Sequence, residues 1–164
     1  MKVIALDPVP RGVRLVVFVG ELGKANSPKV MLYVTYEFNE DEARPAGLAQ
    51  IRTRLRTLFE KEKPDKVFVE PLEGHALRGA NKRNVNIGWF ESAESRGVAA
   101  ETAHSANCNV SFRNRAEVTR SMGDRKGAEY AEDDAFWADE VEGFLPKAYR
   151  EAALMAISFL RAGK

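Results

Sequence analysis

Apolar residues recur along the chain at two spacings, which predict alternating strands and helices. Short runs of β-branched and bulky residues predict strands over 2–6, 13–20, 29–38, 66–70 and 108–113. Apolar residues three and four positions apart predict helices over 46–62, 79–100, 114–122, 125–142 and 147–161. The first three strands follow one another directly, with a turn at Arg11-Gly12, so we expect an antiparallel meander. The fourth strand follows a helix, and this crossover favours parallel pairing with the first.

Two of these strands end at or beside a carboxylate. Asp7 follows the first strand, and Glu70 closes the fourth. The interior of a sheet excludes unpaired carboxylates, and open α/β sheets bind ligands at the carboxyl ends of their strands. Two such acids would repel each other unless a cation neutralised them, and carboxylate oxygens suit Mg²⁺ or Mn²⁺. The alternative is that Asp7 caps a turn before Pro8 and that Glu70 is solvated.

Length and composition describe an ordinary soluble protein. The chain of 164 residues fits one domain over 1–164, and 45% of its residues are apolar and 30% charged. It shows no apolar run long enough to span a membrane and no signal-peptide pattern, so we expect a cytosolic protein with no membrane partner. The single cysteine, Cys108, excludes an intramolecular disulfide and gives no zinc spacing. We expect no small-molecule organic cofactor.

The net charge of +1 hides local basic groups. Residues 111–128 carry five basic side chains and two acids, whereas 129–142 carry seven acids and no base. Such an asymmetry suits a protein that meets phosphate on one face. Two further basic groups are Arg52, Arg54 and Arg56, and Arg78, Lys82 and Arg83. For the first of these we favour the solvated face of a surface helix.

Other candidates carry less weight. His75 and His104 have no ligand-spaced partner, so we expect loop or surface positions. Trp89, Phe90 and Trp137 lie at helical positions, where aromatic side chains more often belong to a core or an interface than to a base-stacking platform.

Several short motifs occur in a fixed order along these elements. They are Ala5-Leu6-Asp7-Pro8, Val67-Phe68-Val69-Glu70, Ser95-Arg96-Gly97-Val98-Ala99, Arg115-Ala-Glu-Val-Thr-Arg120 with the Gly123–Gly127 turn, and Arg150-Glu-Ala-Ala-Leu-Met-Ala156. The order of elements is that of the RNase H-like fold, an α/β fold with a mixed five-stranded sheet flanked by helices. Over most of its length the chain resembles the RuvC-type Holliday-junction resolvases, in particular the compact kind carried by bacteriophages.

The resemblance implies a metal-dependent endonuclease that resolves four-way DNA junctions by paired nicks in opposed strands, leaving 5′-phosphate and 3′-hydroxyl ends. It places Asp7 between two Mg²⁺ or Mn²⁺ ions, Glu70 on one ion beside the attacking water, and Glu151 on the other from the first turn of the last helix. From position alone, Glu151 could instead be a helix-start acid favoured by the macrodipole. We expect phosphate contacts from Arg78, Lys82, Arg83, Arg115, Arg120 and Lys126.

The resemblance also implies a homodimer. In the resolvase family the long helix builds a two-fold interface, so residues 85–98 are the expected contact surface. A two-fold dimer suits a four-way junction, which offers two symmetric strands for paired cuts.

The last helix departs from the family pattern. Family members carry an acid or a histidine three residues before the last acid, where this chain has Ala148. Asp139 or Glu140 could stand in, although their acidic helix favours solvent-facing positions. Glu151 also replaces the more usual aspartate.

Two other functions stay open. One is a related nuclease of the same fold that acts on RNA–DNA hybrids or on branched DNA generally. The other is a junction-binding protein with a lapsed active site, which Ala148 suggests.

Overall fold

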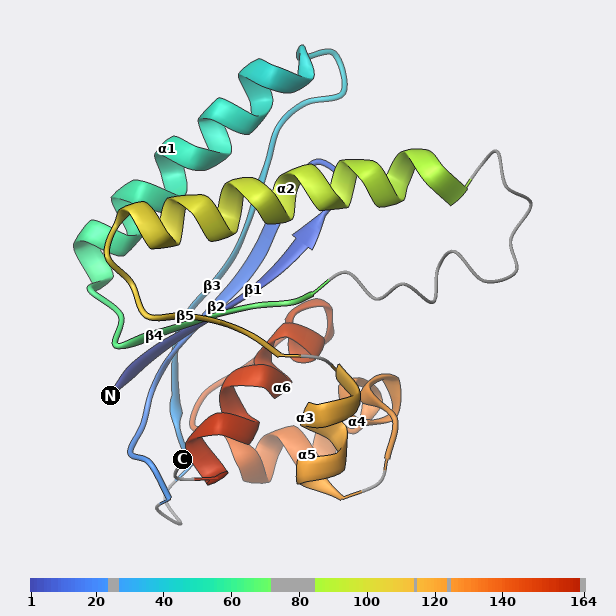
Figure 1. Ribbon diagram of the computed structural model, residues 1–164. Helices are drawn as coiled ribbons and strands as arrows, with labels where there is room; N and C mark the ends of the chain where they lie inside the picture. The colour runs from blue at the N-terminus through green and yellow to red at the C-terminus, as the bar shows by residue number, and fades with distance from the viewer. Residues whose placement is uncertain (24–26, 72–84, 114, 124, 163–164) are drawn as a thin grey trace.

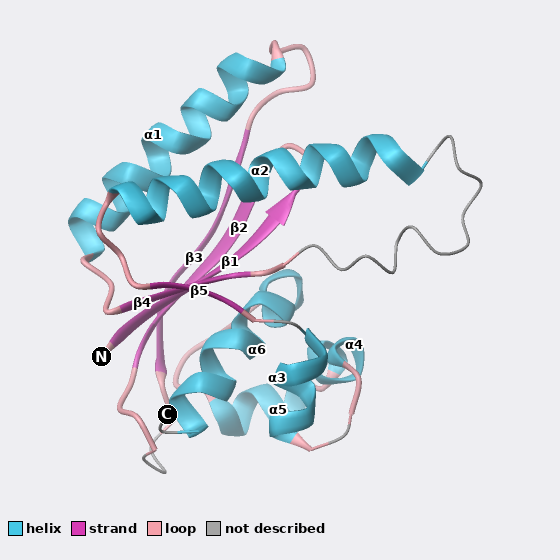
Figure 2. Cartoon of the chain, in the orientation of Figure 1, coloured by secondary structure: helices cyan, strands magenta, loops and turns pink. Residues whose placement is uncertain are grey.

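A mixed sheet forms the middle of the molecule (Figures 1 and 2). The structure is a computed structural model that describes residues 1–23, 27–71, 85–113, 115–123 and 125–162. Within these ranges the sheet has five strands in the order β3-β2-β1-β4-β5. The first three pair antiparallel, whereas β4 lies parallel to β1 and β5 parallel to β4, so the predicted meander and crossover are confirmed. The strands are β1 (Lys2–Val9), β2 (Gly12–Val19), β3 (Lys29–Glu37), β4 (Lys66–Val69) and β5 (Val110–Phe112).

Helices cover both faces of the sheet (Figure 1). Two lie on one face, α1 (Arg44–Glu62) and α2 (Val85–Ser105). On the other face α6 (Lys147–Ala162) packs against β1 and β2, with α3 (Arg115–Met122) and α4 (Gly127–Glu132) against it and α5 (Asp134–Glu140) close by. None of the helices in the described part of the chain is long and apolar enough to cross a membrane.

Two helix predictions need correction. The segment 125–142 is not one helix, because Asp133 has an extended backbone and its carboxylate accepts a hydrogen bond from the amide of Phe136. This contact caps the start of α5 and separates it from α4. The long helix α2 continues to Ser105 rather than stopping at residue 100, and the predicted start over 79–84 lies outside the described residues.

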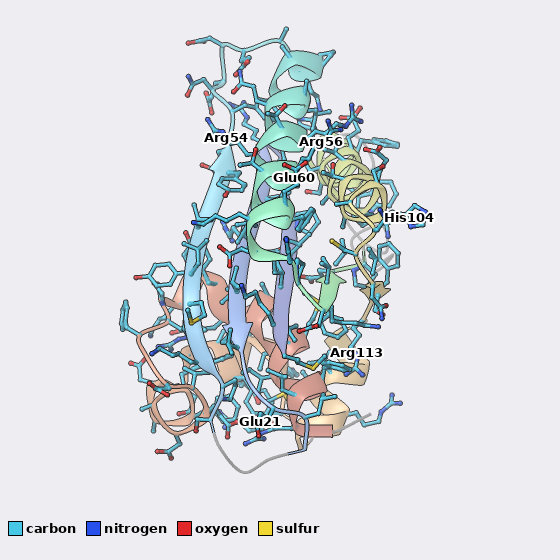
Figure 3. All side chains as sticks on the ribbon, turned by 90° about the vertical axis from the view of Figure 1, so that its left-hand side faces the viewer. Glu21, Arg54, Arg56, Glu60, His104 and Arg113 are labelled. Carbon is cyan, nitrogen blue, oxygen red and sulfur yellow. The ribbon has the colours of Figure 1, made fainter. Side chains whose placement is uncertain are left out.

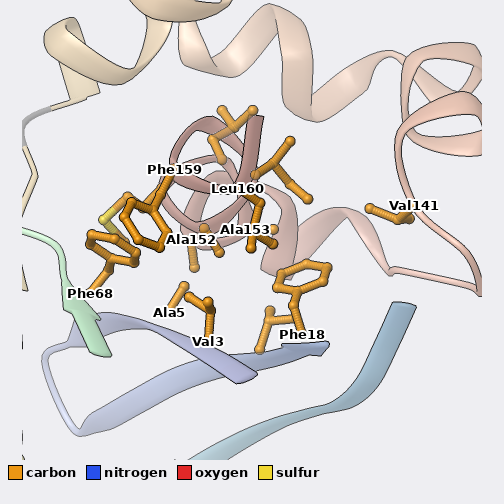
Figure 4. Close-up of a cluster of buried hydrophobic side chains, with 14 of the residues drawn as sticks. Val3, Ala5, Phe18, Phe68, Val141, Ala152, Ala153, Phe159 and Leu160 are labelled. Carbon is orange, nitrogen blue, oxygen red and sulfur yellow. The ribbon is translucent and has the colours of Figure 1, made fainter. Parts of the chain in front are cut away.

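The pleat of the sheet divides the core into two clusters. On β1, Val3 and Ala5 join the cluster that contains the buried side of α6, whereas Ile4 and Leu6 join the cluster beneath α1 and α2. Figure 4 shows the first cluster, with Ala5 beneath α6.

Strand β4 alternates in the same way. Phe68 belongs to the α6 cluster, and its neighbours Val67 and Val69 belong to the other. Because side chains alternate along a strand, the next α6-facing position on β1 is Asp7 and the next on the β4 side is Glu70.

Candidate functional site

Asp7 and Glu70 are neighbours where the parallel pairing of β1 with β4 ends. The first strand does not stop before Asp7 as predicted, because β1 continues to Val9 through its antiparallel pairing with β2. Leu6 pairs with Val69, and the amide of Glu70 donates to the carbonyl of Leu6 at 3.0 Å. One further step of this register places Asp7 beside Glu70. Both are largely buried, since Glu70 is 8% exposed and the Asp7 side chain is 15% exposed. The structure therefore brings these two predicted site residues together on the α6 face.

An arginine continues this row on the other side of Asp7. Arg14 of β2 lies opposite Asp7, and its Nη1 is 3.8 Å from Asp7 Oδ2. Thr35 of β3 lies opposite Arg14, and its hydroxyl is 3.0 Å from the hydroxyl of Tyr149 in α6. The row from Glu70 to Thr35 therefore runs across the sheet beneath the start of α6.

Helix α6 runs antiparallel to β1 and starts at the acidic end of the sheet. Its other end is fixed at the start of β1, because Gly23 donates to the carbonyl of Leu160 at 2.8 Å and Gly20 donates to the carbonyl of Met1 at 3.0 Å. The beginning of α6 therefore lies toward Asp7, as Tyr149 also shows.

Glu151 comes from this end of α6 but faces other helices. It is partly buried and lines a narrow pocket with Leu154 and Met155 of its own helix, Val118 and Thr119 of α3, and Gly127 of α4. Because α6 begins at Lys147, Glu151 stands in the second turn and not in the first turn, as the resemblance implied. Ala148, one turn earlier, is exposed.

The donor chemistry of this end of the sheet fits a divalent cation. Asp7 and Glu70 offer hard carboxylate oxygens on rigid strands, and burial makes their mutual repulsion costly without a counter-charge. Across the described residues, no three acidic, histidine or cysteine side chains are already arranged to hold a metal ion. The described residues thus provide a two-carboxylate corner, whereas Glu151 lines the separate pocket between α3, α4 and α6.

Neither acid of α5 stands in for residue 148. Asp139 is exposed, and Glu140 pairs with Arg161 in the last turn of α6. Residues 148 and 161 are separated by roughly 20 Å along the helix, at about 1.5 Å per residue. Glu140 therefore lies at the wrong end of α6.

A second arginine, Arg150, holds the start of α6 in place. It is 6% exposed, and its guanidinium donates to the carbonyls of Leu145 at 3.1 Å and Ala131 at 2.9 Å and to Asp134 at 2.7 Å. The guanidinium also lies 6.0 Å from the centre of the Trp137 ring. One side chain thus joins α4, α5 and the segment before α6, a role that the sequence motif alone did not reveal.

The expected phosphate contacts are only partly visible. Arg120 in the last turn of α3 and Lys126 just before α4 are both exposed, on the side of the α6 layer. The side chain of Arg115 and the whole segment with Arg78, Lys82 and Arg83 lie outside what the structure describes.

The basic group on α1 lies elsewhere. Arg52, Arg54 and Arg56 are exposed on the opposite face of the sheet from the acids, and Arg52 pairs with Glu101 of α2 at 3.1 Å. Figure 3 shows Arg54 and Arg56 along this helix. The prediction of a solvated helix face is confirmed.

The remaining candidates take ordinary positions. His104 is exposed near the end of α2, as expected, whereas His75 lies outside the described residues. Trp137 is buried in the α6 cluster. On α2, Trp89 is partly buried and touches Phe90, which is 59% exposed. Cys108 is partly buried, and this burial raises the pKa of its thiol.

Comparison with known proteins gives matches in structure only. No protein-family model and no curated protein sequence matches the chain. Among solved structures, Thermus thermophilus RuvC matches with a TM-score of 0.76 and 17% identity over 96% of this chain and 92% of that one. T. thermophilus RuvC in complex with a Holliday junction substrate matches with a TM-score of 0.78 and 16% identity over 99% and 95%.

A third match is the yeast mitochondrial Holliday junction resolvase, Ydc2, with a TM-score of 0.55 and 13% identity over 98% of this chain and 79% of that one. These likenesses extend over nearly the whole chain and confirm the architecture expected from the sequence. The chain has the fold of the RuvC-type resolvases, which is RNase H-like.

Proposed function

We propose that this protein is a metal-dependent endonuclease that resolves four-way DNA junctions by paired nicks in opposed strands. The observation that carries the proposal is the placement of Asp7 beside Glu70, facing α6, within the fold of RuvC. Further support comes from the solved complex of RuvC with a Holliday junction substrate, to which 99% of this chain can be matched.

The acids have distinct roles in this proposal. Divalent ions would supply charge stabilisation at the phosphoryl oxygens and favour an activated water. We assign Asp7 to a position between two Mg²⁺ or Mn²⁺ ions, Glu70 to one ion and Glu151 to the other. The rigid parallel pairing of β1 with β4 fixes the first two carboxylates, and the contacts of Arg150 fix the helix that carries the third.

Junction DNA would lie along the α6 side of the sheet. The exposed Arg120 and Lys126 support this placement, and we assign further phosphate contacts to Arg115 and to the segment with Arg78, Lys82 and Arg83. Phosphate contacts position DNA without reading its bases, so recognition would depend on the shape of the junction and on charge.

Paired cuts require two active sites, which a two-fold dimer would provide. We propose that residues 85–98 of α2 form the contact between the subunits. The 59% exposure of Phe90 on this helix supports the assignment, because a large exposed aromatic side chain often marks an interface. We also propose that the protein acts in the cytosol of a bacterial cell and is of phage type.

The test is a comparison of substrates. The protein is incubated with an end-labelled four-way junction, a linear duplex and an RNA–DNA hybrid, each with and without Mg²⁺ or Mn²⁺. We expect metal-dependent, symmetric nicks in the junction and little cutting of the other two. Equal cutting of the hybrid or of the linear duplex would contradict a junction resolvase and support the related nuclease.

A second candidate is a junction-binding protein without cutting activity. It is favoured by the exposed Ala148 and by the incomplete acid cluster among the described residues. Tight junction binding with no cutting in either metal would support this alternative.

A further inference from the structure

Arg14 is a cation on the acidic face to which neither the family pattern nor the charge distribution assigns a role. Alternate residues of β2 place it there, because Val16 and Phe18 join the α6 cluster whereas Val13 and Leu15 join the other. It is the cross-strand neighbour of Asp7, and its side chain is 39% exposed. The guanidinium is therefore held by the sheet beside the carboxylates and still open to solvent.

Among the residues that the structure describes, the contacts of Arg14 leave most of its donors available. Within the described residues its guanidinium makes one ion pair, with Asp7, and the separation of 3.8 Å is longer than a hydrogen bond. The buried Arg150, in contrast, uses its donors on three protein oxygens. A guanidinium has five N–H donors in a rigid fork that matches two phosphate oxygens.

The charge around Asp7 and Glu70 also favours the binding of a phosphate group. Ala148 stands where the family pattern has an acid or a histidine, and Arg14 offsets part of the charge of Asp7. Both changes weaken the attraction for a second divalent ion. The same positive charge strengthens the attraction for an anionic substrate.

We propose that Arg14 binds the non-bridging oxygens of a DNA phosphodiester at the Asp7–Glu70 corner. Its positive charge would stabilise the negative charge of the phosphate, in part replacing a second divalent ion that binds weakly. This inference rests on the proposed nuclease function and adds a substrate-contacting residue to its site. It gives Arg14 two opposite effects, because the same charge repels a metal ion and attracts the phosphate.

Those opposite effects make the test specific. R14Q removes the charge, R14K keeps the charge without the fork, and R52Q on the opposite face of the sheet is the matched control. Binding of Mn²⁺ to each DNA-free protein is measured by calorimetry. Junction binding and cleavage are then measured at saturating Mn²⁺, and a thermal melt confirms that each variant is folded.

In R14Q we expect Mn²⁺ binding to become about two- to fivefold tighter, since a charge about 4 Å away in a partly solvated site has a modest effect. Cleavage by R14Q at saturating Mn²⁺ should fall by roughly tenfold or more, as expected when a charged hydrogen bond to the substrate is lost. R14K should be intermediate in cleavage, and R52Q should match the unmodified protein in both measurements.

Two results would overturn the inference. One is cleavage by R14Q within twofold of the unmodified protein. The other is weaker Mn²⁺ binding by R14Q, which would show that Arg14 only supports the geometry of the acids. If the unmodified protein cuts no DNA, the proposed function fails separately. Arg14 is then judged by junction binding in Mn²⁺, where weaker binding by R14Q supports the phosphate contact and equal binding refutes it.

Discussion

Arg150 offers a stability test of how the start of α6 is held. Replacing it with methionine keeps an unbranched side chain of similar reach but removes every donor. The carbonyls of Leu145 and Ala131, both in buried surroundings, then lose their partner. Each hydrogen bond from a charged donor contributes about 1.5–3 kcal/mol, so R150M should lower the free energy of unfolding by about 3–5 kcal/mol.

This is a large fraction of the stability of a protein of ordinary size, which is about 5–15 kcal/mol. For a chain of this length about 2–4 °C of melting temperature corresponds to 1 kcal/mol, so the melting temperature should fall by roughly 6–20 °C. R150K should recover only part of the loss, because one ammonium group cannot reach all three oxygens in the planar geometry that arginine uses. D134N is the matched control, since it alters only the exposed end of the network and should have a small effect.

The assay is urea unfolding of each variant followed by far-ultraviolet circular dichroism, with the slope of the transition checked for a change of denatured state. A loss below about 1 kcal/mol in R150M would refute the reasoning, because two buried carbonyls cannot lose a charged donor at so small a cost. A loss in D134N equal to that in R150M would instead place the stabilisation in the exposed ion pair.

Three further changes test other parts of the account. Ala148→Asp adds a carboxylate one turn before Glu151, so half-maximal cleavage should need less Mg²⁺ or Mn²⁺ in a metal titration; an unchanged requirement would mean that position 148 faces away from the site. A triple replacement of Arg115, Arg120 and Lys126 should reduce the slope of log affinity against log salt by roughly 2–3, at about 0.9 per phosphate contact. An unchanged slope would mean that these residues do not contact DNA. Asp133→Ala removes the cap of α5 and should lower the melting temperature at pH 7. The amide of Phe136 and the guanidinium of Arg125 lower the pKa of Asp133. Its stabilisation is therefore present above the unfolded pKa of about 3.9 and is lost as the pH falls through the folded pKa. The melting temperatures of the unmodified protein and the variant should converge in acid, and a difference that does not change with pH would contradict the assignment.

The strands and the acidic end of the sheet could be predicted from the sequence because both depend on local patterns. A strand buried on both faces is a continuous apolar run, and a carboxylate that ends this run marks the edge of the sheet where ligands bind. Once β1 and β4 were expected to be parallel, Asp7 and Glu70 had to lie at the same edge.

The position of Arg14 could not be predicted because it depends on register. The sequence pattern predicts the first turn at Arg11-Gly12, but the chain turns through Pro10 and Arg11, with Val9 opposite Gly12. A shift of one residue in a hairpin changes every cross-strand pair, so only the observed turn places Arg14 opposite Asp7. The Pro10-Arg11 dipeptide was the signal available, since proline suits the first central position of a tight turn.

The surroundings of Glu151 could not be predicted for a different reason. Its pocket is formed by α3 and α4, and their packing against α6 joins segments that are distant in sequence. The break at Asp133 was also missed, because an aspartate within an acidic helical pattern shows its capping role only when its carboxylate reaches a backbone amide.

The most direct test of the central claim compares the unmodified protein with Asp7→Asn on a labelled four-way junction in Mn²⁺. The account predicts paired nicks with 5′-phosphate and 3′-hydroxyl ends from the unmodified protein. It predicts no detectable cleavage by the variant, which should bind the junction at least as tightly because a negative charge near the DNA is gone. Cleavage by Asp7→Asn at the rate of the unmodified protein would contradict the account and remove Asp7 from the active site.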